Sequence, residues 1–187
     1  TLTATAIRSK EGELVGYLGL AVDIRAQLAS QAKLAELNEQ LLQAASVANL
    51  GIWTWYLADN RLVWNEQMYD LYQQPKLLGE LGQLEYRHWS ERLHKQDLAV
   101  AEEALQKALR GEMDYNVIFR LLLPNAETKY VKGQAQVARD GQGNAVSVTG
   151  INLDITERYL YEEELRAARN SAEEASLAKS QFLANMS

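Results

Sequence analysis

The feature that most constrains this chain is an internal repeat, because residues 1–24 match residues 132–155 without a gap. Under one constant offset, identical residues coincide along the whole segment: Ala4 with Ala135, Arg8 with Arg139, Gly12 with Gly143, Val15 with Val146, Gly19 with Gly150, and Asp23-Ile24 with Asp154-Ile155. Each copy predicts a strand, a turn and a second strand, which is the signature of a β-hairpin. We infer a duplication in which residues 1–25 are the terminal hairpin of a preceding domain, while the second copy closes a complete domain.

A helical pattern follows each hairpin. Residues 26–48 predict a linker helix, and residues 157–187 predict a second helix that runs to the end of the chain. Both carry a narrow apolar stripe at alternating spacings of three and four. The first holds Leu34, Leu37, Leu41, Ala44 and Ala48; the second, interrupted only by Lys179, holds Tyr161, Leu165, Ala168, Ala172, Ala175, Phe182 and Met186. Packing against a neighbouring domain explains one such stripe equally well. Two stripes that flank one domain favour a parallel coiled coil, and therefore a homodimer.

The residues between the two helices predict one α+β domain. Strands are expected at 51–57 and 61–64, followed by a short helix at 66–72 and a loop-rich stretch. Asp97 is then expected to cap a helix at 98–109 that Gly111 ends. Three strands complete the domain, at 115–122, 131–137 and 145–155. This order predicts a five-stranded antiparallel sheet with helices on one face, flanked by N- and C-terminal coiled-coil helices.

Composition excludes several classes of function. The chain has no cysteine, which rules out disulfides, thiolate catalysis and cysteinyl-flavin chemistry. Its net charge of −6 disfavours nucleic acid as a partner. The longest apolar stretches are too short to span a bilayer, so we expect a cytoplasmic location. The chain lacks an initial methionine and ends within a helical pattern, so we expect a piece of a longer protein, whose own membrane anchoring stays open.

Several motifs resemble the PAS domain family over residues 49–158. They are Gly51-x-Trp53-x-Trp55, His94-x-x-Asp97, Phe119-Arg120, Asp140-Gly141, and the closing Gly150-Ile151-Asn152-Leu153-Asp154-Ile155-Thr156-Glu157-Arg158, which is the most specific. The resemblance implies a PAS fold for residues 49–156 and a signalling helix at 157–177. Residues 178–187 (AKSQFLANMS) resemble the start of the dimerisation and phosphotransfer helix of histidine kinases. This implies a two-component sensor, acting on a downstream kinase domain of the same chain and, through it, on a response regulator.

The sequence contains few residues arranged for chemistry of its own. We expect no catalytic residue and no metal site, because the sequence holds no nucleophile triad, phosphate-binding glycine loop or pair of metal-binding histidines. His88 and His94 are the candidates for an axial haem ligand. Both precede the long helix, where Trp89 and Leu93 predict inward packing and His94 matches a position that shapes the turn, so a structural role is favoured. We expect no covalently bound cofactor, and neither haem nor a cysteinyl-flavin; the identity of any other ligand is left open.

A set of residues predicted to face the interior could bind a ligand. On the last strand Asn152, Gly150 and Val148 share one face, and in flavin-binding relatives the position of Asn152 holds an amide that contacts the chromophore. Asn152 is equally suited to bond the backbone near the exit helix. Gly133 and Ala135 on the facing strand leave room for a ligand, or for Trp53 or Trp55. The candidate ligand-binding residues are Asn152, Val148, Gly133, Ala135, Phe119, Val117, Trp53 and Trp55.

The junction between the last strand and the exit helix is the candidate signalling element. It comprises Asp154, Ile155, Thr156 and Glu157, where Asp154 or Thr156 can cap the new helix and Glu157 adds negative charge near the positive end of its dipole. The leading hypothesis is a dimeric input and transmission module whose signal depends on a ligand or on conformation. The alternative is a ligand-free relay that only dimerises and transmits, and an aromatic side-chain filling of the interior would favour it.

Overall fold

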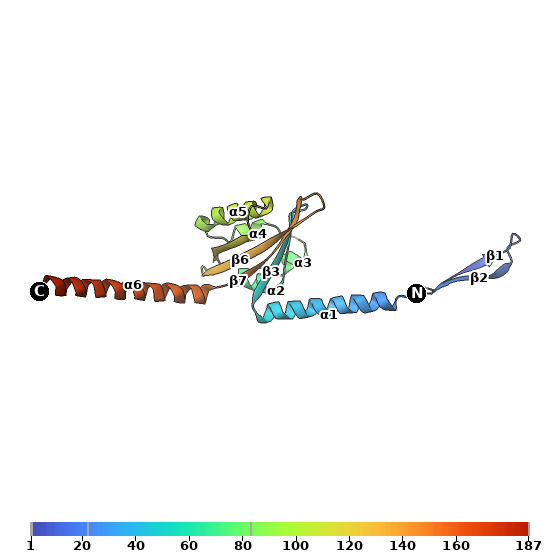
Figure 1. The fold of residues 1–187 in the computed structure, drawn as a ribbon. Helices are drawn as coiled ribbons and strands as arrows, with labels where there is room; N and C mark the ends of the chain where they lie inside the picture. The colour runs from blue at the N-terminus through green and yellow to red at the C-terminus, as the bar shows by residue number, and fades with distance from the viewer. Residues whose placement is uncertain (1, 22, 83, 187) are drawn as a thin grey trace. The chain divides into compact units, whose positions relative to one another are not determined.

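The computed structural model describes residues 2–21, 23–82 and 84–186, which form two compact units, Thr1–Ala44 and Ala45–Ser187 (Figure 1). The predicted first hairpin includes Thr1 and Val22, and the predicted kinase segment includes Ser187. These three residues lie outside the described part of the chain. Each unit is considered by itself.

The first unit contains a two-stranded antiparallel hairpin of β1 (Leu2–Arg8) and β2 (Leu14–Ala21), followed by helix α1 (Arg25–Val47), whose last residues belong to the second unit. A register shift follows Ile7, and Gly12 adopts a φ of 88° in the turn. Asp23 then accepts a hydrogen bond from the backbone N of Arg25 at 3.0 Å, which satisfies one amide at the start of α1.

The second copy of the repeat has the same local structure. In the hairpin of β6 (Thr128–Arg139) and β7 (Ala145–Asp154), the register shift follows Ala138 and Gly143 has a φ of 87°. Asp154 accepts from the backbone N of Thr156 at 3.0 Å, where helix α6 (Thr156–Asn185) begins. Positions that the sequence repeat pairs therefore share their turn, their bulge and their helix cap.

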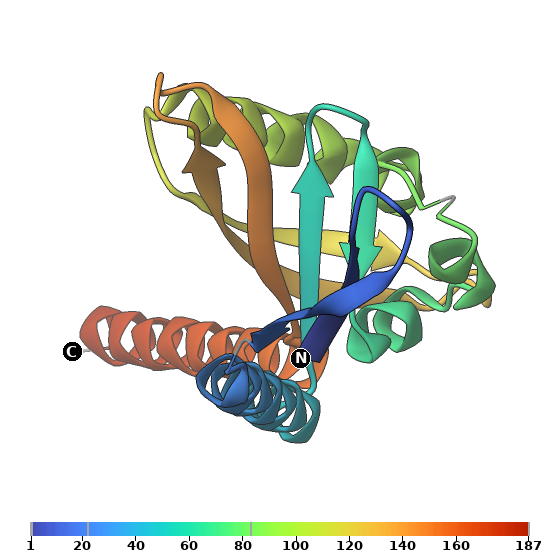
Figure 2. The same cartoon turned by 90° about the vertical axis from the view of Figure 1, so that its right-hand side faces the viewer.

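The second unit is built on one antiparallel sheet in the order β4-β3-β7-β6-β5. Its remaining strands are β3 (Leu50–Tyr56), β4 (Arg61–Trp64) and β5 (Tyr115–Leu122). Between β4 and β5 lie the helices α2 (Glu66–Tyr72), α3 (Leu77–Glu80), α4 (Arg87–Ser90) and α5 (Lys95–Arg110). The predicted α+β fold with five antiparallel strands is confirmed, and the helices lie on one face of the sheet (Figure 2).

Two details of the helices differ from expectation. The stretch expected to be loop holds the four-residue helices α3 and α4, which are too short to show a helical period in sequence. Helix α5 begins at Lys95, and its N-cap is His94, whose ring nitrogen accepts from the backbone N of Gln96 at 3.3 Å. The prediction that Asp97 caps this helix is wrong, because its carboxylate binds Arg120 instead. Gly111 ends α5 with a φ of 78°, as predicted.

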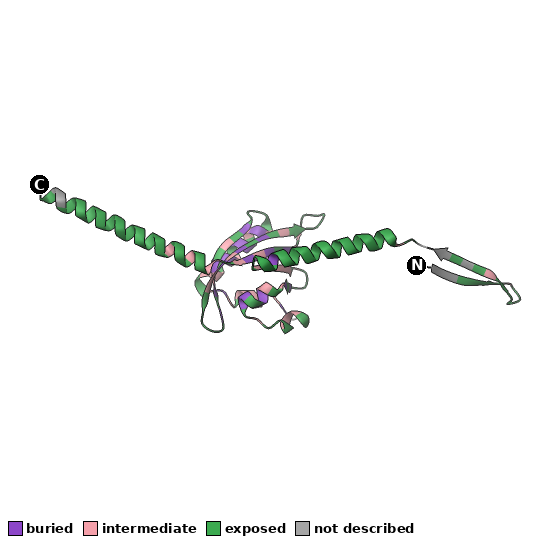
Figure 3. Ribbon diagram, turned by 90° about the horizontal axis from the view of Figure 1, so that it is seen from below, coloured by how far each residue is buried: buried purple, intermediate pink, exposed green. Residues whose placement is uncertain are grey.

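The core lies between the sheet and α2–α5. Alternate residues of each strand point toward the helices, and on β7 these are Val148, Gly150 and Asn152, all of which are buried. Helix α6, in contrast, is exposed over most of its length (Figure 3). None of the helices in the part of the chain that the structure describes is long and apolar enough to cross a membrane.

Candidate functional site

Asn152 is the polar centre of the core. It is 1% exposed and is the buried polar residue of the described core. Its side-chain oxygen accepts from the indole N–H of Trp53 at 3.0 Å, and its NH2 group donates to the hydroxyl of Tyr72 at 2.8 Å. The amide thus bonds side chains of β3 and α2. Its partners are not the backbone groups near α6 that the sequence offered as an alternative. Its oxygen and its nitrogen are both engaged by the protein itself.

Tyr72 completes this network from helix α2. Its side chain is fully buried, and burial raises the pKa of its hydroxyl well above the ordinary value. Proximity to Tyr115 raises the pKa further, while the hydrogen bonds from Asn152 and Trp89 partly oppose the shift. Tyr72 therefore stays neutral and serves as a hydrogen-bonding group within an apolar interior.

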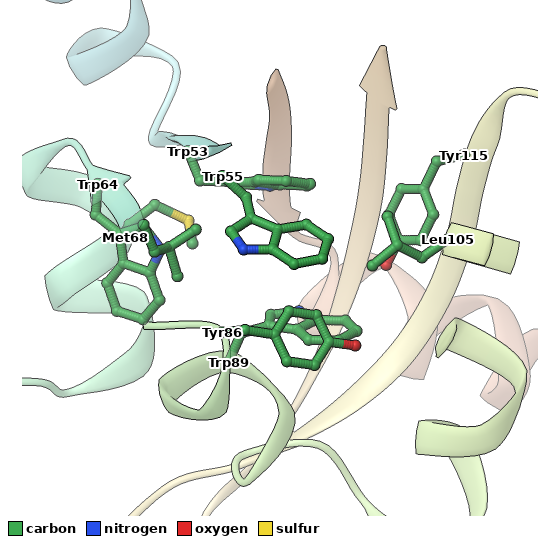
Figure 4. Close-up of a pocket in the computed structure, with 9 residues that line it drawn as sticks. Trp53, Trp55, Trp64, Met68, Tyr86, Trp89, Leu105 and Tyr115 are labelled. Atoms are coloured by element: carbon green, nitrogen blue, oxygen red, sulfur yellow. The ribbon is translucent and has the colours of Figure 1, made fainter. Parts of the chain in front are cut away.

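Aromatic side chains line the remaining cavity (Figure 4). All four tryptophans of the chain take part, and the full lining is Trp53, Trp55, Leu62, Trp64, Met68, Tyr86, Trp89, Leu105 and Tyr115. The rings meet one another directly, since the centroids of Tyr86 lie 4.9 Å from Trp55 and 5.1 Å from Trp89. The space that remains is about 20 Å³, which accommodates about one water molecule.

Small residues on the sheet make room for this aromatic filling. A Cβ added to Gly133 would lie 3.1 Å from the Phe119 ring and 3.3 Å from the side-chain oxygen of Asn152. One added to Gly150 would lie only 2.5 Å from the indole of Trp53. The small residues were expected to make room either for a ligand or for Trp53 or Trp55. In the structure, Gly133 accommodates the rings of Tyr115 and Phe119 together with Asn152, and Gly150 accommodates Trp53.

The other predicted interior residues lie in the same region. Phe119 is 2% exposed and meets Trp89 edge to face, while Val148 and Ala135 are buried in the part of the core that contains Tyr115. Val117 and Trp55 are half-buried and pack against both parts of the core. The structure therefore brings the eight predicted residues together on the inner face of the sheet. Sequence reasoning did not single out Tyr72, Trp64, Tyr86 or Trp89 as members of this site.

The exit junction is held by a compact set of polar contacts. Asp154 accepts from both the backbone N and the hydroxyl of Thr156, the latter at 2.6 Å, and pairs with Lys129 at 2.9 Å. Burial acts to raise the pKa of Asp154, but the bonds from Thr156 and Lys129 outweigh it and hold the pKa below its ordinary value. Asp154 is therefore an ionised helix cap at neutral pH. Glu157 is exposed in the first turn of α6, where its charge complements the helix dipole.

Tyr130 on β6 connects this junction to the sheet. Its backbone N donates to the hydroxyl of Thr156 at 2.9 Å, and its carbonyl accepts from the N of Ile155 at 2.8 Å. Its ring stacks on Tyr159 of α6, with centroids 4.0 Å apart. Sequence reasoning missed Lys129, Tyr130 and Tyr159. The available signal was that Tyr130 directly precedes Val131, where the predicted strand begins, and could therefore extend that strand.

The two histidines have structural roles in this arrangement. The Nδ1 of His88 accepts from the backbone N of Glu85 at 3.0 Å, and His94 caps α5. Among the described residues, no group of three histidine or acidic side chains is placed to hold a metal ion. Asp97 instead forms a bidentate pair with Arg120, at 2.8 Å and 2.7 Å, which joins α5 to β5.

An antiparallel sheet of this order, with helices on one face and a helix leaving the last strand, defines a PAS-type sensory domain. Residues 61–152 match the family model described as the PAS fold, so this part of the chain is a PAS domain. Its fold is shared by a sensory box histidine kinase/response regulator from Burkholderia thailandensis E264, with 20% identity and a TM-score of 0.61 over 72% of this chain and 98% of that one. The N-terminal domain of a diguanylate cyclase with PAS/PAC sensor from Marinobacter aquaeolei aligns with 18% identity and a TM-score of 0.51, over 59% and 98%.

A curated relative in Escherichia coli (strain K12), the probable diguanylate cyclase DgcE, is 24% identical over 160 residues. The match covers 83% of this chain but 14% of that protein. The PAS domain is a sensory module, and these similar proteins carry the names of two different outputs, histidine kinase and diguanylate cyclase.

Proposed function

We propose that this chain is a dimeric cytoplasmic transmission module, in which the PAS domain passes a conformational signal to an output domain through α6. The observation that carries the proposal is the aromatic filling of the core, which leaves about 20 Å³. A drug-sized ligand needs a cavity of several hundred Å³. The filled core therefore favours the relay over a ligand sensor, and it ties β3, β7, α2 and α4 into one packed unit.

The test of relay against sensor is direct. Native mass spectrometry of the gently purified protein is expected to give the protomer mass of 21.0 kDa, or twice that mass, without an adduct. A stoichiometric small molecule that is released on unfolding would overturn the relay. Trp89→Ala is the matched variant: it removes a ring from the core, and it should create binding of small aromatic compounds that the unaltered protein lacks.

Dimerisation is the second part of the proposal. Large apolar side chains of both predicted stripes are exposed: Leu34, Leu37 and Leu41 on α1, Tyr161, Leu165 and Phe182 on α6, and Met186 just beyond its end. Single helices with such stripes are marginal in water, whereas two copies bury them against each other. Light scattering should give a dimer that Leu165→Glu dissociates, because Leu165 is on the stripe. Leu160→Glu, outside the stripe, should leave it intact. A monomer at tens of micromolar would exclude this part.

For the output domain we propose a histidine kinase, with a response regulator as its partner. The support is the sequence of residues 178–187, which resembles the start of a kinase dimerisation helix. Diguanylate cyclase is the second candidate, because the curated relative and one of the structures of the same fold carry that name. Assays of autophosphorylation and of diguanylate cyclase activity in the parent protein separate the two, and the PAS fragment itself is proposed to have neither activity.

We also propose that residues 1–25 belong to a preceding PAS domain. Its support is the shared turn, bulge and Asp cap of the two hairpins. Gly19 corresponds to Gly150 in the repeat, yet an added Cβ at Gly19 meets no described atom within 4 Å. Gly19→Ala should therefore be tolerated by this chain but should destabilise a longer protein that contains the remaining strands. Equal tolerance in both would remove the proposed domain.

A further inference from the structure

The stacked pair of Tyr130 and Tyr159 lies where α6 leaves the sheet. Their ring centroids are 4.0 Å apart and their planes differ by 14°. Tyr159 is half-buried in the first turn of α6, whereas the next two residues, Leu160 and Tyr161, are 54% and 66% exposed. The stack is therefore a side-chain contact between the sheet and the first turn of the helix.

Tyr130 uses three separate groups at this point. Its amide and carbonyl bond Thr156 and Ile155, and these bonds hold the chain at the end of β7. The ring reaches further along α6, past Thr156 at its start, to Tyr159. Loss of the ring contact would thus leave the strand ladder in place while it frees α6 to change direction.

The pair is also connected to the aromatic core. Tyr130 lies opposite Arg120 on β5, and Arg120 is held by the carboxylate of Asp97 on α5. The preceding residue, Phe119, points to the other face of the same strand, where it meets Trp89 with centroids 6.2 Å apart. Arg120, Tyr130 and Tyr159 line the same hollow. A shift of β5 that follows repacking in the core would therefore move Arg120 beside the stacked pair.

We infer that Tyr130 and Tyr159 are positioning residues: their stack holds α6 docked on the sheet in one signalling state, and its separation releases the helix in the other. This inference rests on the proposed transmission through α6. A stacked aromatic pair shifts an equilibrium by about 2- to 10-fold. Such a factor suffices to bias two states that are otherwise nearly balanced.

The absence of cysteine from the sequence permits a direct measurement. Nitroxide labels at Gln142→Cys and Asn170→Cys, both exposed sites, report the distance from the β6–β7 turn to α6. Dilution with unlabelled protein removes distances between protomers. A narrow distribution is expected for the unaltered protein and for Tyr159→Phe, which keeps the ring. Tyr159→Ala should broaden the distribution, and the neighbouring exposed site Leu160→Ala should not.

Two outcomes overturn the inference, and they differ in meaning. An unchanged distribution in Tyr159→Ala shows that the stack does not position α6, whatever the output domain does. A broadened distribution with unchanged activity of the parent protein shows that α6 is positioned by the stack but does not transmit, which removes the proposed function as well. The expected result is a change in output of at least about 2-fold in Tyr159→Ala that Tyr159→Phe does not cause. Melting temperatures of all variants identify any that fail to fold.

Discussion

The replacement of Gly150 by alanine tests how tightly the core is filled. Gly150 on β7 lies opposite Trp53 on β3, and the indole covers the place where a side chain would be. An added Cβ would lie 2.5 Å from one indole carbon, 2.7 Å from another and 2.6 Å from the backbone oxygen of Gln134. Carbon atoms in contact are ordinarily about 3.5–4.0 Å apart, so the indole has to move by about 1 Å.

The cost follows from three contributions. Overpacking of this kind destabilises the folded state by about 1–3 kcal/mol. A displaced indole also loses its 3.0 Å bond to Asn152, and an oxygen left unpaired in the core costs about 1–3 kcal/mol. The alanine also lowers the conformational entropy of the unfolded chain, which stabilises the folded state by about 0.4–1 kcal/mol. We therefore expect a net loss of about 1–5 kcal/mol in the free energy of unfolding and a melting temperature lowered by on the order of 10 °C.

Thermal unfolding followed by tryptophan fluorescence is the appropriate assay, because all four tryptophans line the core. Gly19→Ala is the matched control: it makes the same chemical change at the position that the repeat pairs with Gly150. It should leave the transition of the PAS domain unchanged. If Gly150→Ala melts within about 2 °C of this control, the packing that we describe around Trp53 is refuted.

Three further predictions concern the polar groups. Asn152→Leu removes the bonds to Trp53 and Tyr72 and should lower the free energy of unfolding by about 1–3 kcal/mol in denaturant titrations; an unchanged midpoint would show that the network is dispensable. Burial raises the pKa of Tyr72, so the contribution of the neutral hydroxyl to stability is complete below the unfolded pKa of about 10 and is lost as the pH rises beyond it. The melting temperatures at pH 8 and pH 11 should therefore differ less in Tyr72→Phe than in the unaltered protein. Equal differences in the two proteins would contradict this prediction. The folded pKa of Asp154 is lowered, so the contribution of its carboxylate to stability is present above an unfolded pKa of about 4 and is lost as the pH falls through the folded value. Asp154→Ala should remove this part of the acid dependence, leave the domain folded and alter the output of the parent protein. Unchanged melting with unchanged output would identify Asp154 as an ordinary turn residue.

Much of the fold could be predicted because its signals are local. The bounds of β4, α2 and β5 agree with the expected ranges, since turns, a proline and alternating apolar residues delimit them. The Asp-x-Thr junction was identified from the capping requirement of a new helix. Asp97 shows the limit of such reasoning: an acidic residue at a helix start is a good cap, but a partner 23 residues away in the sequence, Arg120, bonds it instead.

The candidate site was only half predictable for the same reason. Asn152 was recognised as an inward-facing amide from the period of its strand. Its partners were not, because Tyr72 and Trp53 lie 80 and 99 residues away in the sequence. Nor could the sequence choose between a ligand and aromatic side chains as the filling of the core, since small residues on a strand make room for either.

The sequence by itself determined the elements of this protein: the repeated hairpin, the Asp-capped helices and the inner face of each strand follow from turn residues, capping and periodicity, which act within a few positions. Only the tertiary structure decided which side chains meet. The register of five strands brings Trp53 over Gly150, and the direction of α6 brings Tyr159 onto Tyr130. These contacts depend on the positions of elements distant in the chain, where close packing leaves each side chain a single place.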